Sequence, residues 1–299
     1  MKMTNLISSW FSSHNSYKQT NIETQNNYSS EVKTLLESVD GYFYDGNIRE
    51  AFEFLDKAIE RQTHKESKYF LLLKKIEYFL ECRNIKEAKK YLDLIKKNYA
   101  DYIGVKYKEH LLFIYSLEHN KNEYLTLVGE IKLEKSDIKS DEYFNLIYAL
   151  NSGDSDEAKK IFNSLVEDER NKNNLIAGHV FANSYRITND LDDLKKATEY
   201  YQLLLNDNPK FLIKLHILGF FVSNIINNYF QTKNEFDKKQ VIEYKQLLKT
   251  IFEVQKYFNN NYINDLKKFH AFILLILNFK DEYIKFYEEH QTVSSIKEA

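Results

Sequence analysis

Apolar residues recur along the chain at helical spacing, and short polar breaks separate them at nearly even intervals. Leu35, Val39 and Tyr42 fall on one face of a helix predicted over about 31–45, and Ala51 and Leu55 fall on one face of a second helix over about 47–61. The same alternation of two helices continues as far as Pro209. The pattern therefore predicts a chain built from helical hairpins.

A repeated helix start marks the second helix of each predicted hairpin. Asn47, Asn84, Asn120 and Asp154 each precede a Glu by three residues, and a looser copy begins near Asp193. A short polar side chain at this place can accept a hydrogen bond from the first turn, and the Glu can reach back to the cap's own N–H. The four caps are 37, 36 and 34 residues apart, which is typical of a repeat array.

The helices lengthen after Pro209. We expect them over about 210–231, 237–258, 262–279 and 281–290. The predicted organisation is a flexible N-terminal segment over 1–29, a repeat array over 30–209, divergent C-terminal hairpins over 210–290 and a frayed tail over 291–299.

The repeats resemble the tetratricopeptide repeat (TPR) family. The small residue that opens the family's second helix matches Ala51, Ala88, Ala158 and Ala197, and the aromatic near the end of its first helix matches Tyr42, Phe79, Tyr115 and Tyr185. The second-helix aromatic matches Phe162 and Tyr201, the second small residue Ala58, and the closing proline Pro209. The chain departs from the family where no Trp opens a unit and where Val39 or Ile76 replaces a Gly.

The resemblance implies an all-α, right-handed superhelical solenoid of antiparallel helix hairpins, with about five TPR-like units and two divergent hairpins at the C-terminus. It also implies a concave groove lined by the first helices. The family's groove positions correspond to Phe43, Tyr44, Phe70, Leu73, Glu77, His110, Phe113, Tyr143, Ile147, His179, Asn183 and Arg186. This predicted groove is aromatic and apolar in four units and polar in the fifth. It lacks the Lys and Asn with which some members hold a peptide carboxylate.

A second candidate site lies in the N-terminal segment. An apolar stripe at helical spacing precedes a polar tether, and it comprises Met3, Leu6, Ile7, Trp10 and Phe11. It can pack on the protein's own first layer, insert into a partner or touch a membrane surface. The chain has no unbroken apolar run of a secretory signal and no uninterrupted span of the length a membrane helix requires.

The composition removes several function classes. Basic and acidic residues number 42 and 44, so the footprint of a nucleic-acid-binding surface is missing overall. The single Cys82 cannot form an internal disulfide, which favours a reducing, cytoplasmic location. No phosphate loop, nucleophile elbow or metal-binding His pair is present. We therefore expect no enzyme activity, no cofactor and no metal.

The remaining hypotheses concern binding. The first is a scaffold or adaptor that binds a partner protein or peptide through an apolar concave groove, as a subunit of a larger assembly. The second is a regulatory receptor for a short peptide, and an RNA-binding repeat is a third. The sequence leaves the partner and the oligomeric state open.

Overall fold

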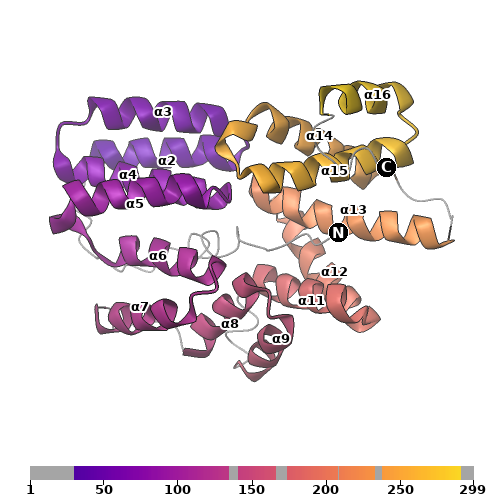
Figure 1. The fold of residues 1–299 in the computed structure, drawn as a ribbon, viewed down its shortest axis with the longest axis horizontal. Helices are drawn as coiled ribbons and strands as arrows, with labels where there is room; N and C mark the ends of the chain where they lie inside the picture. The colour runs from indigo at the N-terminus through magenta and orange to yellow at the C-terminus, as the bar shows by residue number, and fades with distance from the viewer. Residues whose placement is uncertain (1–29, 135–140, 166–173, 208, 233–237, 291–299) are drawn as a thin grey trace. The chain divides into compact units, whose positions relative to one another are not determined.

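A computed structural model describes residues 30–134, 141–165, 174–207, 209–232 and 238–290 (Figure 1). Within these residues the chain forms fourteen α-helices, two short 3₁₀ helices and no strand, so the predicted all-α class is confirmed. The chain divides into two compact units, of which the first ends at Lys210 and the second begins at Phe211.

The first unit is a row of five antiparallel helix pairs. They are α2 (Ser30–Tyr44) with α3 (Ile48–Arg61), α4 (Lys65–Glu81) with α5 (Ile85–Asn98), α6 (Val105–Leu117) with α7 (Lys121–Glu134), α8 (Asp141–Ser152) with α9 (Ser155–Ser164), and α11 (Asn174–Thr188) with α12 (Leu191–Asn206). The first helices also touch one another in the order α2, α4, α6 and α8. This packing of successive helix pairs is consistent with a helical repeat.

One backbone turn joins the helices of most pairs. In the first pair Gly46 takes a positive φ of 94°, its N–H donates to the carbonyl of Phe43 at 3.2 Å, and the N–H of Asn47 donates to the carbonyl of Tyr42 at 2.9 Å. These bonds define a Schellman motif that satisfies the last carbonyls of the helix. Equivalent left-handed residues stand at Arg83, His119 and Gly153. Each is followed at once by the cap of the next helix.

The predicted caps behave differently from one pair to another. Asn84, Asn120 and Asp154 accept hydrogen bonds from the N–H groups of the Glu three residues on, at 3.3, 3.4 and 3.1 Å. Asn47 occupies the cap position, but its side chain makes no capping bond.

The fifth copy begins earlier than the looser pattern near Asp193 suggested. The cap is Asp190, whose carboxylate accepts from the N–H of Asp192 at 3.0 Å. Asp193 is buried instead, and its Oδ2 lies 2.6 Å from both Ser184 Oγ and Lys159 Nζ. It therefore links α9, α11 and α12.

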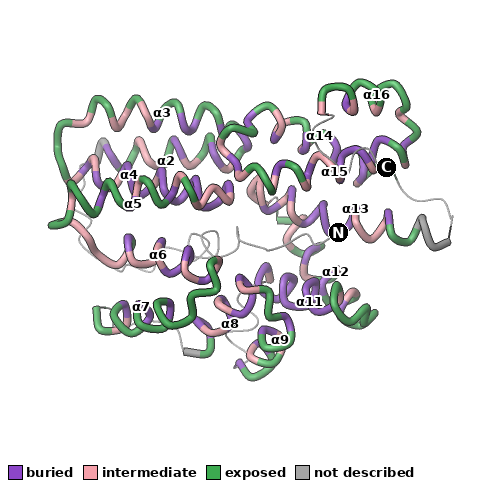
Figure 2. The backbone as a smooth tube through the Cα atoms, viewed as in Figure 1, coloured by how far each residue is buried: buried purple, intermediate pink, exposed green. Residues whose placement is uncertain are grey.

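Small residues allow the two helices of a pair to approach. Ala51, Ala88, Ala158 and Ala197 are all fully buried. The third pair has the bulkier Tyr124 at the corresponding position, and it is fully buried as well. Outer helices such as α3 and α5 keep many exposed positions, whereas α4 and α11 are mostly buried (Figure 2).

The register at the end of α2 differs by one residue from the expectation. Tyr42 was expected in the core, but it is 44% exposed, and Phe43 is fully buried in its place. Spacings of three and four residues from Val39 both lie on one helix face. Packing against the next pair decides between them, because the Phe43 ring stacks on Tyr78 with centroids 3.9 Å apart.

The second unit contains two further pairs of helices. They are α13 (Phe211–Thr232) with α14 (Lys239–Glu253) and α15 (Asn260–Ile276) with α16 (Lys280–Glu289). The turn before α16 repeats the first unit's motif, because Asn278 has a φ of 58° and the N–H of Phe279 donates to the carbonyl of Leu274 at 2.9 Å. Ala271, Leu274 and Phe286 form a small core between the last two helices.

A polar inner face on the first three helix pairs

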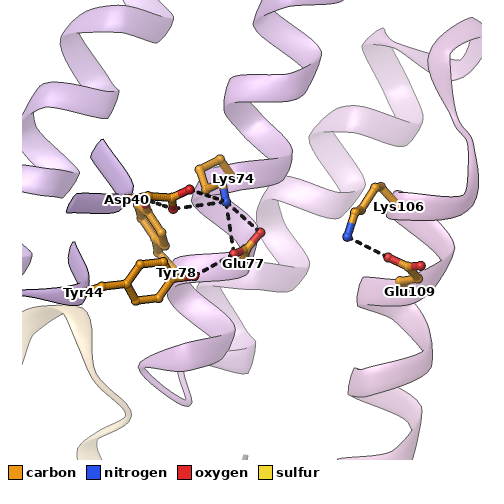
Figure 3. A network of polar contacts seen from close by, with 7 residues as sticks. All are labelled: Asp40, Tyr44, Lys74, Glu77, Tyr78, Lys106 and Glu109. Carbon is orange, nitrogen blue, oxygen red and sulfur yellow. Dashed lines mark hydrogen bonds and ion pairs between the residues drawn. The ribbon is translucent and has the colours of Figure 1, made fainter. Parts of the chain in front are cut away.

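The first helices of three consecutive pairs bring charged side chains together. Lys74 on α4 lies 3.2 Å from Asp40 Oδ1 on α2 and 3.1 Å from Glu77 Oε1 on its own helix (Figure 3). The spacing of Lys74 and Glu77 places both on one side of α4. One ammonium group therefore bridges two carboxylates that belong to different pairs.

Two tyrosine hydroxyls complete this network. Tyr44 on α2 donates to Glu77 Oε1 at 3.1 Å, and Tyr78 on α4 donates to Asp40 Oδ1 at 2.8 Å (Figure 3). The ring of Tyr78 is held by its stack on Phe43. The polar contacts between α2 and α4 are thus fixed by aromatic packing directly beneath them.

Lys74 and Glu77 remain ionised in spite of their burial. Burial opposes the ionised form of Lys74, but Glu77 and Asp40 outweigh it and raise the pKa of Lys74 to about 12. Burial also opposes the ionised form of Glu77, yet Lys74, Lys106 and His110 lower its pKa to about 2. Both partners are charged at neutral pH.

One further carboxylate lies a turn beyond Glu77. Glu81 is only 6% exposed, and its Oε1 has no hydrogen-bond partner among the described residues. Burial, followed by the charge of Glu77, raises the pKa of Glu81 well above its ordinary value. Lys210, the last residue of this unit, lies over the ring of Tyr44 with its Nζ 3.4 Å from the centroid.

The third helix of the row extends the face. Lys106 on α6 pairs with Glu109 at 3.0 Å, and the Lys106 side chain is 57% exposed. His110 is buried, and burial lowers its pKa to about 4, so the ring is neutral at pH 7. We call this set of side chains the polar inner face. Its members are Asp40, Tyr44, Lys74, Glu77, Glu81, Lys106, Glu109 and His110.

The structure does not present the predicted aromatic groove as an open surface. Of its twelve positions nine are buried, namely Phe43, Leu73, Glu77, His110, Phe113, Tyr143, Ile147, His179 and Asn183. Tyr44 and Phe70 are half-buried and Arg186 is exposed. Three of the aromatic side chains of the predicted groove, Phe43, Phe113 and Tyr143, pack inside the protein. Only Tyr44, Glu77 and His110 join the polar inner face.

The fifth-pair residues of the predicted groove have local roles. His179 Nδ1 lies 2.6 Å from the hydroxyl of Tyr201, within the packing of α11 against α12. Arg186 donates to the side chain of Asn183 at 3.4 Å. The N-terminal stripe from Met3 to Phe11 lies outside the described residues.

Sequence reasoning missed Asp40, Lys74, Glu81, Lys106 and Glu109. A signal was present, because Lys74, Glu77 and Glu81 are spaced three and four residues apart within residues 69–81, where every other position except Lys75 is apolar or aromatic. Charged residues at such spacing on an otherwise buried helix indicate an inner polar surface.

The described residues contain no group of three or more His, Cys, Asp or Glu side chains placed to hold a metal ion. Among the described residues, the stretch Phe211–Asn228 of α13 is long and apolar enough to cross a membrane by length and composition, and half of it is buried within the protein. No family model, curated protein or solved structure matches the chain.

Proposed function

We propose that the protein is a non-enzymatic, cytoplasmic scaffold or adaptor that binds a partner protein or peptide through the polar inner face. The array would then be a TPR-like, right-handed superhelical solenoid, with the first helix of each pair on its binding side. Such proteins need no cofactor, because binding rests on the shape and charge of a surface built from successive repeats.

The observation that carries this proposal is the bridge from Lys74 to Asp40 and Glu77. Burying three charges has a desolvation cost, and apolar residues of similar size would fill the same space at equal or lower free energy. Clusters of titratable groups with strongly shifted pKa values occur preferentially at functional sites. The cluster therefore favours recognition over simple packing.

The predicted mode of binding changes accordingly. An apolar groove favours an amphipathic helix, whereas paired charges with fixed tyrosine hydroxyls favour a partner with complementary polar groups. This chemistry also fits the second hypothesis, a receptor for a short peptide.

Affinity capture with the tagged full-length protein from its native cells tests the proposal. We expect a stoichiometric partner that is lost when Lys106→Glu reverses an exposed charge of the polar inner face. Lys86→Glu on α5, an exposed position away from this face, is the matched control and should retain the partner.

Two outcomes would count against the proposal. One is that Lys106→Glu retains the partner as well as Lys86→Glu does, with both variants folded. The other is that the partner is lost only when Leu6, Trp10 and Phe11 are changed to Ser, which would move the site to the N-terminal stripe.

A further inference from the structure

We propose that the polar inner face contains a binding site for a primary ammonium group of the partner, formed by the ring of Tyr44 and the carboxylate of Glu81. Lys210 of the chain itself now lies in this site as a tethered competitor. The ligand class is therefore a Lys side chain or a free amino terminus. The inference deepens the proposed function, on which it rests for the source of the ammonium group.

The aromatic half of the site is already in use. The Nζ of Lys210 lies 3.4 Å from the centroid of the Tyr44 ring, which is the geometry of a cation–π contact. The Tyr44 hydroxyl donates to Glu77 Oε1 at 3.1 Å, so the ring is fixed in place. A hydrogen bond to a carboxylate also increases the electron density of the ring, which favours a cation above it.

The carboxylate half of the site is not in use. Glu81 Oε1 is buried and accepts no hydrogen bond from the described residues, and Lys210 Nζ is also buried and donates none to them. Lys210 therefore contacts the ring without a hydrogen bond to Glu81, although its charge acts on Glu81 and favours the ionised carboxylate. An ammonium group free to move could make both contacts, and the hydrogen bond to a charged acceptor would add to its affinity.

The charges around the site select a cation. Asp40 and Glu77 share Lys74, whereas Glu81, a third acidic side chain of this face, forms no ion pair with the residues that the structure describes. An anionic ligand would be repelled by Glu77, whereas a cation would be attracted to Glu77 and would favour the ionised form of Glu81. Glu81 can therefore form an ion pair with the ammonium group of the partner.

Replacement of Lys210 should increase the affinity for an added ammonium group. An increase identifies Lys210 as a competitor for the site, whereas a decrease would identify it as a part of the site. A tethered group competes at an effective concentration of roughly millimolar or more. The probe is N-acetyl-lysine methylamide, measured by calorimetry or saturation-transfer NMR with the full-length protein. We expect Lys210→Met to bind it about tenfold more tightly than the wild type and Glu81→Gln to bind it about tenfold more weakly.

Two controls make the comparison specific. N-acetyl-norleucine methylamide has the same four-carbon side chain without the ammonium group, and it should not bind. Lys256→Met removes another cation–π contact, with the ring of Tyr257 in the second unit, and should leave the affinity for the lysine probe unchanged.

Proton release provides a readout that needs no variant. A bound ammonium favours the ionised form of Glu81, so binding should release a proton, and the affinity should rise with pH up to the free pKa of Glu81. Calorimetry in two buffers of different ionisation enthalpy measures this proton. The charged and titratable groups that interact with Glu81, or with Glu77 beside it, are Tyr44, Lys74, Glu77, Tyr78, Cys82, Arg83, Lys106, His110 and Lys210, and Asp40 acts on Lys74 and Lys210.

Several results would overturn the inference. They are the absence of measurable binding by the lysine probe, equal binding of the norleucine probe, an unchanged or weakened affinity in Lys210→Met, and binding without proton release. Failure here is distinguishable from failure of the proposed function. A partner lost in Lys106→Glu while the lysine probe fails to bind leaves the function standing, and the reverse pattern leaves only the ammonium site.

Discussion

Replacement of Lys74 by Met tests the electrostatic account of the polar inner face. The change preserves most of the apolar stem but removes the ammonium group that bridges Asp40 and Glu77 at 3.2 and 3.1 Å. The side chains of Lys74 and Glu77 are only 14% and 11% exposed, so water cannot replace the lost partner fully. An unpaired buried charge remains.

The cost follows from the pKa of Glu77. Its pKa is about 2 in the folded protein and 4.5 ordinarily, a difference that corresponds to about 3 kcal/mol at pH 7. Breaking a buried ion pair by removing one partner typically costs about 3–5 kcal/mol. Lys74→Met should therefore lower the free energy of unfolding by about 3 kcal/mol.

Lys89→Met is the matched control. Lys89 forms an ion pair with Glu118, but these side chains are 47% and 39% exposed, and such pairs contribute about 0–1 kcal/mol. The double variant Lys74→Met with Glu77→Gln should recover part of the loss, because it removes a stranded carboxylate as well as its partner.

Urea unfolding followed by far-ultraviolet circular dichroism measures these differences in the free energy of unfolding. The comparison holds for variants whose free energy depends on urea concentration with the same slope, the m-value. The lowered pKa of Glu77 contributes stability above pH 4.5, and that contribution is lost as the pH falls toward about 2. The difference in the free energy of unfolding between wild type and Lys74→Met should become smaller as the pH falls from 4.5 toward 2. The reasoning is refuted if Lys74→Met costs no more than Lys89→Met at pH 7.

Three further predictions concern backbone, packing and pH. Gly46→Ala should destabilise by about 1–2 kcal/mol because the residue has a φ of 94°, whereas Gly41→Ala in the open interior of α2 should stabilise by about 0.5–1 kcal/mol, both measured by urea unfolding. Gly178→Ala should lower the free energy of unfolding by about 1–3 kcal/mol, because the added Cβ would lie 2.5 Å from a ring atom of Tyr201 on α12. Gly129→Ala is the control: its Cβ meets no atom within 4 Å, so this change should stabilise the protein. Thermal unfolding compares the two variants. The pKa of His110 is lowered to about 4, so stability should fall as the pH drops from 6.5 toward 4, and His110→Gln should reduce that slope in a series of unfolding curves.

Each of these predictions has a clear contrary result. Equal signs for Gly46→Ala and Gly41→Ala would contradict the left-handed turn at Gly46. A neutral change at the α11 position would contradict the close approach of α11 and α12. An unchanged pH slope in His110→Gln would mean that the ring titrates in the folded protein much as it does in the unfolded chain.

The sequence alone determined the helices and where they pair. Helix formation and capping depend on residues within a few positions of each other, so Asn84, Asn120 and Asp154 marked the helix starts correctly. The small residues Ala51 and Ala88 marked the buried contact of each pair for the same local reason. The repeat period then gave the order of the pairs.

The tertiary structure decided which side chains meet between pairs. Asp40 and Lys74 are far apart in sequence, and only the packing of α2 against α4 brings them to 3.2 Å. The same packing chose Phe43 over Tyr42 for the core, since both fit the helical period and only the stack on Tyr78 distinguishes them. A local pattern predicts which face of a helix is buried, but the charges that face one another across two helices depend on the register of their packing.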